Sequence, residues 1–409
     1  MMQECTDASA EPAAREHTNG MSPAESIEVS VVMPCLNEAD TIAACVETAR
    51  RALYDAGIHG EVIVADNGST DDSAAIARRS GARVVHVSAP GYGNALAGGI
   101  EAARGRFVVM GDADQSYDFA DAPKFVAKLR TGYTLVQGCR LPGGGGSIRP
   151  DAMPWLHRWL GNPILTLLAR LWFRSPVHDV YCGMRGFTAD LVERLNVRST
   201  GMEFAAEMII KASLHREPIA EVPITLHLDG RKAHPPHLRT FRDGWRTLRL
   251  FLLFSPRWLF LVPGVVLAVV GAAGYAIALP GLTIRGVGFD VHTLLFASLS
   301  IVAGHQAIAF ALFTKTFAVG EGFLPADDRL TRFFRVATLE RGLLLGGACA
   351  LAGIALLAGT AFQWWRAGLG PLDYPVTMRW AIPGATLTVL GLQTIFASFF
   401  VSILALRRR

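Results

Sequence analysis

The stretch V-S-V-V-M-P-C-L-N-E, residues 29–38, is an apolar run that ends in a polar sequence. A second apolar run at residues 61–65 ends at Asp66. Residues 41–54, between the two runs, have helical spacing of apolar side chains, with Thr41 as the expected N-cap. Because two strands joined by a helix of this length form a parallel pair, the stretch predicts a βαβ unit.

The same alternation continues along the chain, with further strands expected at 82–87, 106–110 and 134–138 and a helix at 94–103. Strands that alternate with helices indicate an α/β fold with a doubly wound, mostly parallel sheet. Ligands bind such sheets beyond the C-terminal ends of the strands. The polar clusters of chemical interest fall at these ends, so we expect the functional site there.

An acidic pair, Asp112 and Asp114, follows the fourth expected strand. Two carboxylates at this spacing can face one cation, and Mg²⁺ or Mn²⁺ takes few protein oxygens and completes its shell with water and phosphates. Such a metal stabilises charge on a departing diphosphate. The pattern alone is common in turns, but its place after two other polar strand ends favours a metal site. For Asp66, an Asx-turn is the alternative to a contact with a nucleotide.

The composition divides the chain into two unlike parts. Of its 409 residues, 51% are hydrophobic and 18% charged, and the apolar excess follows residue 258. The net charge of +4 does not suggest a nucleic-acid partner. None of the six cysteines forms a CxxC pair, which argues against a zinc site or a disulfide framework. Residues 1–26 are polar, and we expect a disordered tail rather than a signal peptide.

Four uncharged apolar runs predict a C-terminal bundle of about four transmembrane helices. Each run has about 20 residues or more, enough to cross a bilayer; they are 258–279, 293–314, 342–364 and 380–406, within a transmembrane domain at 258–409. His305 and Gln306 lie in mid-span, where interhelical hydrogen bonds are favoured over a lipid groove. Arginine and lysine concentrate between the second and third runs and after the fourth. The positive-inside rule therefore predicts a multi-pass protein with both termini and the catalytic domain in the cytosol.

Two amphipathic segments precede the spans. Residues 153–173 suit a helix lying at the membrane interface, with burial in the core as the alternative. Residues 233–257 predict a juxtamembrane helix with a basic stripe beside an apolar one; the stripe consists of Arg239, Arg242, Arg246 and Arg249. These arginines either hold anionic membrane lipid or present a lipid phosphate to the site.

The ordered motifs V-S-V-V-M-P-C-L-N-E, A-D-N-G-S-T-D, G-Y-G-N-A and G-D-A-D resemble the family 2 glycosyltransferases of GT-A fold. More closely, the chain resembles polyprenol- or dolichol-phosphate mannose or glucose synthases with C-terminal transmembrane helices. H-D-V-Y-C-G-M-R-G-F (178–187) is similar to the acceptor-side segment of that branch, and the glycine and arginine at 230–231 are similar to its closing arginine. The resemblance implies a GT-A domain at 27–232.

What the resemblance implies for single residues follows the motifs. The nucleotide would be held by Pro34, Asn37, Glu38, Asp66, Gly91 and Asp112. The metal, Mg²⁺ or Mn²⁺, would be bound by Asp112, Asp114 and Gln115, although the synthases carry their glutamine one position later, where this chain has Ser116. Catalytic roles fall to Asp114, Arg185 and Arg231, and the acceptor phosphate to Arg140, Arg185, Arg239, Arg242 and Arg246.

The expected reaction is the inverting, metal-dependent transfer of one sugar from a nucleotide-diphosphate sugar, GDP-mannose or a UDP-hexose. The acceptor would be a polyprenyl or dolichyl phosphate at the cytosolic membrane face. Because a phosphate monoester is largely dianionic at neutral pH, its oxygen needs no general base. A processive polysaccharide synthase is a rival, although its Q-x-x-R-W segment is absent; a non-catalytic membrane scaffold is another. The sequence leaves open whether the chain forms a homo-oligomer.

Overall fold

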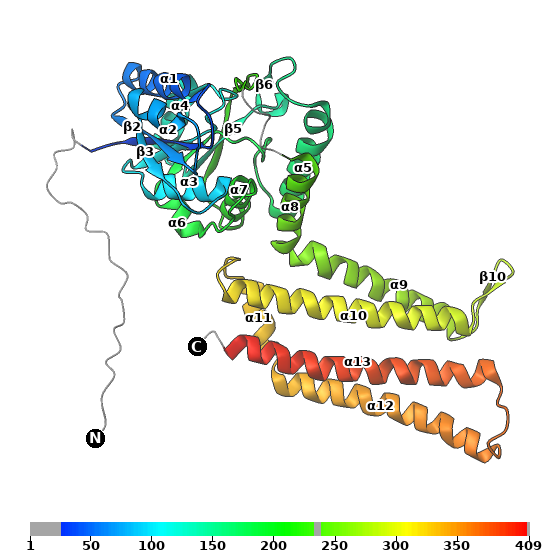
Figure 1. The fold of residues 1–409 in the computed structure, drawn as a ribbon. Coiled ribbons are helices and arrows are strands. Elements are labelled where there is room, and N and C mark those ends of the chain that lie inside the picture. Colours follow the sequence, from blue (N-terminus) through cyan, green and yellow to red (C-terminus); the bar gives the residue numbers. More distant parts are fainter. Residues whose placement is uncertain (1–25, 233–238, 407–409) are drawn as a thin grey trace, which may run out of the picture.

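The computed structural model describes residues 26–232 and 239–406 and has two parts, an α/β domain and a helical bundle (Figure 1). The predicted tail at 1–26 lies outside the described residues except for Ser26, and so does the start of the predicted juxtamembrane helix, 233–238. The fold class predicted from the alternation of strands and helices is confirmed.

The α/β domain is built on a sheet with strand order β3-β2-β1-β4-β7-β5-β8. Its strands are β1 Val29–Cys35, β2 Gly60–Asp66, β3 Arg83–His86, β4 Phe107–Met110, β5 Leu135–Cys139, β7 Arg185–Thr188 and β8 Ile219–Pro223. Strand β7 runs antiparallel to its neighbours β4 and β5, and the other pairs in this sheet are parallel. The short strands β6 Ser147–Ile148 and β9 Thr225–Leu226 pair beside it.

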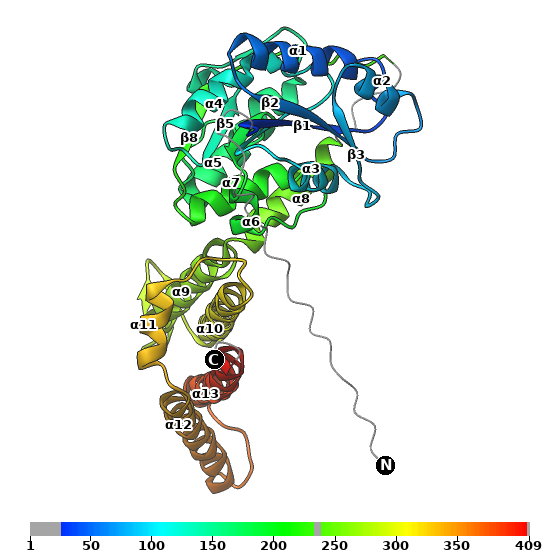
Figure 2. The same cartoon turned by 90° about the vertical axis from the view of Figure 1, so that its left-hand side faces the viewer.

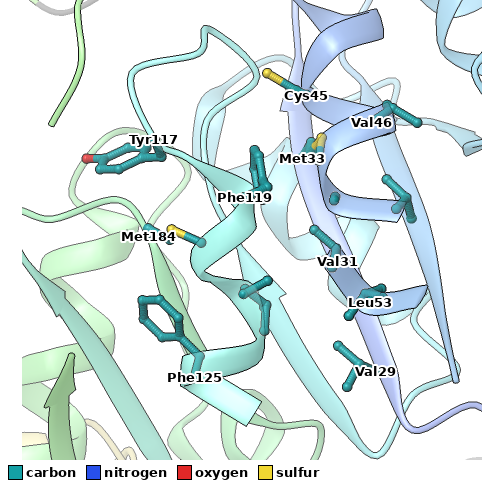
Figure 3. Packing of buried hydrophobic residues seen from close by; sticks show 14 of the residues in the cluster. Val29, Val31, Met33, Cys45, Val46, Leu53, Tyr117, Phe119, Phe125 and Met184 are labelled. Atoms are coloured by element: carbon teal, nitrogen blue, oxygen red, sulfur yellow. The ribbon is translucent and has the colours of Figure 1, made fainter. Parts of the chain in front are cut away.

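Helices cover both faces of the sheet because β1 sends alternate side chains to opposite sides. Val29, Val31 and Met33 pack under α1, α2 and α4 (Figure 3), whereas Val32 packs with the helices of the other face. These helices are α1 Ile42–Asp55, α2 Ser73–Arg79, α3 Tyr92–Glu101, α4 Ala122–Arg130, α5 Asn162–Phe173, α6 Leu191–Leu195, α7 Phe204–Leu214 and α8 Thr240–Leu253. The apolar core thus fixes the sheet edge at which the polar strand ends meet.

Two local details differ from the sequence-based expectation. Thr41 precedes α1 as predicted, but its hydroxyl donates to the Glu38 carbonyl and carboxylate instead of capping the helix. Strand β7 was not expected as a strand. It is only four residues long, and its pairing partners β4 and β5 lie far away in sequence, so no local periodicity marks it.

The described C-terminal residues contain four helices long and apolar enough to cross a membrane, as predicted: Arg257–Ala278, Val291–Gly320, Leu339–Arg366 and Tyr374–Ala405. They correspond to a short π-helical turn with α9 Val262–Ala278, then α10 Val291–Gly320, α12 Leu339–Arg366 and α13 Tyr374–Leu406. A short amphipathic helix, α11 Asp328–Val336, joins α10 to α12, and the hairpin β10 Thr283–Ile284 and β11 Val287–Gly288 joins α9 to α10. The chain is therefore a membrane protein.

Small residues and partly buried polar side chains hold the bundle together. A Cβ on Gly304 would lie 2.7 Å from the Gly264 carbonyl oxygen, so α9 and α10 approach closely. His305 on α10 contacts Gln393 and Thr394 on α13, at 3.1 and 3.2 Å between the bonding atoms. For His305, the structure therefore shows the interhelical hydrogen bonds that the sequence favoured.

The arrangement of the two parts places α5 and α8 at their junction. In Figure 1 these helices run across the direction of the spans, and α8 leads directly into the first span. The connection from α10 to α11 and the end of α13 lie at the same end of the bundle as the α/β domain, whereas the β10–β11 hairpin lies at the opposite end (Figures 1 and 2).

Candidate active site

A cavity of about 730 Å³ opens at the C-terminal edge of the sheet. It is lined by residues that follow β1, β2, β4 and β5, by the segment after β9, by the loop before α5 and by the start of α8. Of the residues predicted for the site, those that line it are Pro34, Glu38, Gly91, Asp112, Asp114, Arg140, Arg231, Arg239 and Arg242. The cavity therefore brings together side chains separated by up to about two hundred residues of sequence.

The acidic pair forms the centre of the sheet-side wall. The Tyr92 hydroxyl donates to Asp112 Oδ1 over 2.7 Å, and the Ser116 amide donates to Asp114 Oδ1 over 2.9 Å. Burial, and then the negative charge of Asp114, raise the pKa of Asp112 to about 6. A cation beside both carboxylates would relieve this repulsion.

Arg231 connects three acidic side chains across the cavity. Its Nε donates to both carboxylate oxygens of Glu38, at 2.9 and 2.8 Å, and its terminal nitrogens lie 3.3 Å from Asp114 Oδ2 and 2.8 Å from Asp229 Oδ2. Although burial opposes the charge, the hydrogen bond to Glu38 and the nearby carboxylates raise the pKa of Arg231 above its ordinary value. The end of β1, the end of β4 and the segment after β9 are thereby fixed to one another.

The donor set fits a hard divalent cation that keeps much of its shell for water and phosphate. Among the described residues, no three His, Cys, Asp or Glu side chains are grouped closely enough to hold a metal alone. Mg²⁺ commonly uses only one or two carboxylates together with substrate phosphates. Gly183 leaves space beside the pair, because a Cβ there would lie 2.9 Å from Asp112 Oδ2.

The structure corrects the expectation for Gln115. This residue has a positive φ of 64°, and its side chain packs against Gly230 and lines a neighbouring cavity with Cys45. Gln115 is not among the described residues that line the main cavity with the acidic pair. Ser116, the next residue, lines the main cavity and donates to Asp114 instead.

Two residues predicted to contact the nucleotide are engaged in holding loops. Asn37 Oδ1 accepts hydrogen bonds from the Thr70 amide and hydroxyl, at 2.8 and 3.2 Å. The buried Asp66 carboxylate accepts from the Ser69 amide and lies 3.1 Å from His86 Nδ1. Neither residue is among those that line the cavity in the described part of the chain. The bond from Ser69 spans three residues, one more than in an Asx-turn, and through it Asp66 holds the loop that follows β2.

The arginines predicted for the acceptor are distributed unevenly. Arg140 lines the cavity but forms a two-point ion pair with the buried Asp179, at 2.7 and 2.9 Å. Arg239 and Arg242 lie exposed at the start of α8, on the rim of the cavity. Arg246 follows one turn later on α8 and is not among the residues described as lining the cavity.

The structure also corrects the expectation for Arg185. Its side chain is fully buried on β7, and its terminal nitrogens donate to the carbonyls of Ala205 and Cys182, at 2.6 and 2.5 Å. Burial lowers the pKa of this guanidinium. Because its terminal donors face backbone and no solvent reaches the side chain, Arg185 supports the cavity wall instead of contacting an acceptor.

Several lining residues were not identified from the sequence. Tyr92, Asn67, Tyr117, His157 and Asp229 line the cavity. A weak signal existed for Tyr92, which lies between the two glycines of the G-Y-G motif, and for Asn67, which follows Asp66. Asn67 Oδ1 accepts from the Gly91 amide over 2.7 Å and so fixes the start of α3. His157 had no signal, because only the fold places it 2.9 Å from the Thr240 hydroxyl of α8.

A doubly wound sheet with an acidic pair at its C-terminal edge, joined to a membrane bundle, defines a glycosyltransferase that acts on nucleotide sugars. The chain belongs to glycosyltransferase family 2. The family model "Glycosyl transferase family 2" matches residues 30–195, and "Glycosyltransferase family 2 C-terminal transmembrane region" matches residues 312–405. The enzyme class and the family predicted from the motifs are both confirmed.

Relatives of this chain include sugar transferases of Haloferax volcanii. The low-salt glycan biosynthesis hexosyltransferase Agl6 of Haloferax volcanii is 38% identical over 375 residues, which cover 91% of this chain and 88% of that protein. A dolichyl-phosphate hexose transferase of the same organism is 33% identical over 198 residues, covering 48% of this chain and 82% of that protein. A solved glucosyl-3-phosphoglycerate synthase from Mycobacterium tuberculosis is 27% identical, covers 56% of this chain and 80% of its own, and gives a TM-score of 0.45, too low to assign residues.

Proposed function

We propose that this enzyme transfers a single sugar, with inversion, from a nucleotide-diphosphate sugar to a polyprenyl or dolichyl phosphate. The observation that carries the proposal is the cavity, whose sheet-side wall holds Asp112 and Asp114 and whose opposite rim holds Arg239 and Arg242. The first wall suits a metal and a diphosphate, and the second suits a phosphate monoester.

The position of the arginine rim favours a lipid-borne acceptor. On α8, next to these arginines, Phe241 and Trp245 are 84% and 59% exposed. On the segment before α5 and on α5 itself, the exposed apolar side chains are Trp155, Trp159, Leu160, Ile164, Leu167 and Leu171. Because α8 leads directly into the first span, these side chains are at the level of the membrane surface, which supports the predicted interface helix at 153–173. A phosphate on a lipid chain would reach the rim from this side.

Chain orientation follows from the charges at one end of the bundle. Lys315 lies near the end of α10, Arg341 lies at the start of α12, and Arg329, Arg332 and Arg335 lie on α11 between them. The connection from α10 to α11 is at the same end of the bundle as the α/β domain (Figure 1). The positive-inside rule places that end, with the active site and the end of α13, in the cytosol. The nucleotide sugar would therefore come from the cytosol and the acceptor from its membrane leaflet.

Each group of residues would have a defined part in the reaction. Asp112 and Asp114 would hold Mg²⁺ or Mn²⁺, which supplies positive charge to the departing diphosphate. Arg231 would exchange some of its carboxylate contacts for the diphosphate, and Arg239 and Arg242 would orient the acceptor. An acceptor phosphate oxygen then bonds to the anomeric carbon as the bond to the diphosphate oxygen breaks, and the dianionic acceptor needs no base.

The proposal is tested with membranes that contain the full chain, incubated with radiolabelled GDP-mannose, UDP-glucose or UDP-galactose, polyprenyl phosphate and Mg²⁺ or Mn²⁺. We expect label in the organic phase for one donor, loss of that label with EDTA, and a product that carries one sugar. Asp118→Asn serves as the control for Asp112→Asn, since Asp118 is an exposed carboxylate that accepts from the Ala120 amide near the cavity. A polymer would support the processive rival, and full cellular function of Asp112→Ala would support the scaffold.

A further inference from the structure

The connection between α10 and α11 contacts the catalytic domain. In both views it reaches from the bundle toward the end of the domain near α6 (Figures 1 and 2). There the Arg198 guanidinium lies over the ring of Phe323, 5.0 Å from its centroid. The Phe323 amide donates to the Ala318 carbonyl of α10 over 2.8 Å, and Gly322 supplies the left-handed turn with a φ of 71°. Phe323 is therefore held on the end of the second span.

Arg198 belongs to the loop between α6 and α7, which a buried ion pair holds from inside. The amides of Arg198 and Ser199 donate to the Glu207 carboxylate, at 3.1 and 2.7 Å to Oε2. Glu207 pairs with Lys211 at 2.6 Å, and Lys211 also donates to the Asn196 carbonyl. Glu207 and Lys211 are 3% and 1% exposed. The first part of the loop is thus tied to α7 through Glu207 and Lys211.

The same loop packs against the start of α3 on the donor side of the cavity. The Gly93 amide donates to the Thr200 carbonyl over 2.9 Å. A Cβ on Gly91 would lie 2.4 Å from that carbonyl oxygen, so only glycine allows this approach. Between these glycines, Tyr92 reaches Asp112 with its hydroxyl. Direct contacts therefore run without a gap from Phe323 in the membrane part to Asp112.

We propose that Arg198 and Phe323 are positioning residues for the donor site, through which the end of the second span supports nucleotide binding. The connection from α10 holds the loop between α6 and α7 against α3, and α3 holds Tyr92 on Asp112. This proposal rests on the proposed function, because it requires the cavity to bind a nucleoside diphosphate. The contact between the spans and the catalytic domain would thereby support nucleotide binding, a role that needs both parts of the chain.

The test measures binding of UDP and of GDP, each with Mn²⁺, to the purified full chain in lipid nanodiscs by isothermal titration calorimetry. We expect Phe323→Ala to weaken the better nucleotide about 3- to 10-fold, as loss of one cation–π contact would. Phe323→Leu, which keeps apolar bulk, should weaken it similarly, and Phe323→Tyr should remain within about twofold of the wild type. Phe333→Ala, which removes a half-exposed ring from α11, is the matched control and should have no effect.

Coupling between the two residues is tested with Arg198→Ala and the double variant Arg198→Ala/Phe323→Ala. If one contact carries the effect, the double variant binds no more weakly than either single one. Equal nucleotide affinity in wild type, Phe323→Ala and Phe323→Leu would overturn the inference and leave the proposed function intact. A wild-type chain that binds neither nucleotide with Mn²⁺ would instead remove the proposed function. Unchanged melting temperatures show that a weaker affinity does not reflect unfolding.

Discussion

The two walls of the cavity hold their charges in different ways. On the sheet side, Glu38, Asp114 and Asp229 all contact one arginine, Arg231, whose side chain is nearly buried. On the membrane side, Arg239 and Arg242 are exposed. Asp243 accepts from the Arg239 backbone amide and from the Arg242 guanidinium. The sheet side is organised before any substrate arrives. The membrane side is open, which suits a surface that the lipid and its phosphate complete.

The largest effect is expected at the acidic pair. Asp114→Asn removes one of the two carboxylates available for a metal and leaves Arg231 with one fewer acidic partner. We expect a loss of roughly a thousandfold or more in kcat, because stabilisation of charge in the transition state is often worth this much. The measurement is transfer of labelled sugar to polyprenyl phosphate over a range of Mn²⁺ concentrations. Asp118→Asn should retain activity, and activity near wild type in Asp114→Asn would contradict the metal assignment.

Arg231→Lys tests whether the sheet-side wall of the cavity depends on the several hydrogen-bond donors of a guanidinium. Lysine keeps the charge but cannot contact Glu38, Asp114 and Asp229 together. We expect kcat/KM for the nucleotide sugar to fall by about two orders of magnitude, as for loss of one strong contact to transition-state charge. Arg83→Lys is the control, since Arg83 makes a similar two-point pair with Glu61 away from the cavity. A loss in both variants would indicate a general effect on the fold.

Arg242→Gln tests the exposed membrane-side wall of the cavity. Its effect on activity should be smaller and confined to the lipid acceptor. Removal of one exposed phosphate contact should raise the KM for polyprenyl phosphate about tenfold, in the range of one charge-assisted hydrogen bond. The KM for the nucleotide sugar should not change. Arg249→Gln, one residue of the same basic stripe farther from the rim, is the control in the same vesicles. Equal effects of the two substitutions would favour the lipid-holding alternative for the whole stripe.

The smallest effect concerns pH and His157, which joins the membrane-side wall. Burial, and then the positive charge of Arg140, lower the pKa of His157 below its ordinary value. The folded state therefore binds fewer protons than the unfolded state just below pH 6.5, and stability rises with pH through this window. We expect His157→Gln to lose less stability than wild type when the pH falls from 7.5 to 5.5. Thermal unfolding in detergent at both pH values measures this, and an identical pH response would show that His157 is not responsible.

Much of the sheet and the four spans could be predicted, because the residue pattern that identifies each strand or span lies within that segment. The short apolar run of β1, which is buried along its whole length, and the long apolar runs within 258–406 are visible in the order of residues. Strand β7 could not be predicted, since its place between β4 and β5 depends on partners distant in sequence. The same distinction holds in the site. Asp112 follows directly from its strand, whereas His157 reaches the cavity only through the packing of α5 and α8.

The residues that were assigned wrongly show a related limit. The sequence identifies Arg185 as a cation next to a motif, but it does not reveal that backbone carbonyls surround its guanidinium. Gln115, whose φ is positive, lines the neighbouring cavity and not the one that the acidic pair lines. Both outcomes depend on side-chain direction, which a motif does not encode.

Arg231 also has a consequence for the sequence of substrate addition. Because Arg231 already contacts Oδ2 of Asp114, an isolated divalent ion would have to compete with this guanidinium for the carboxylate. A nucleotide that arrives with its ion bound brings its own negative charge, to which Arg231 can turn as the acids turn to the ion. The ion and the nucleotide are then expected to bind as one complex, because each frees the contacts that the other needs.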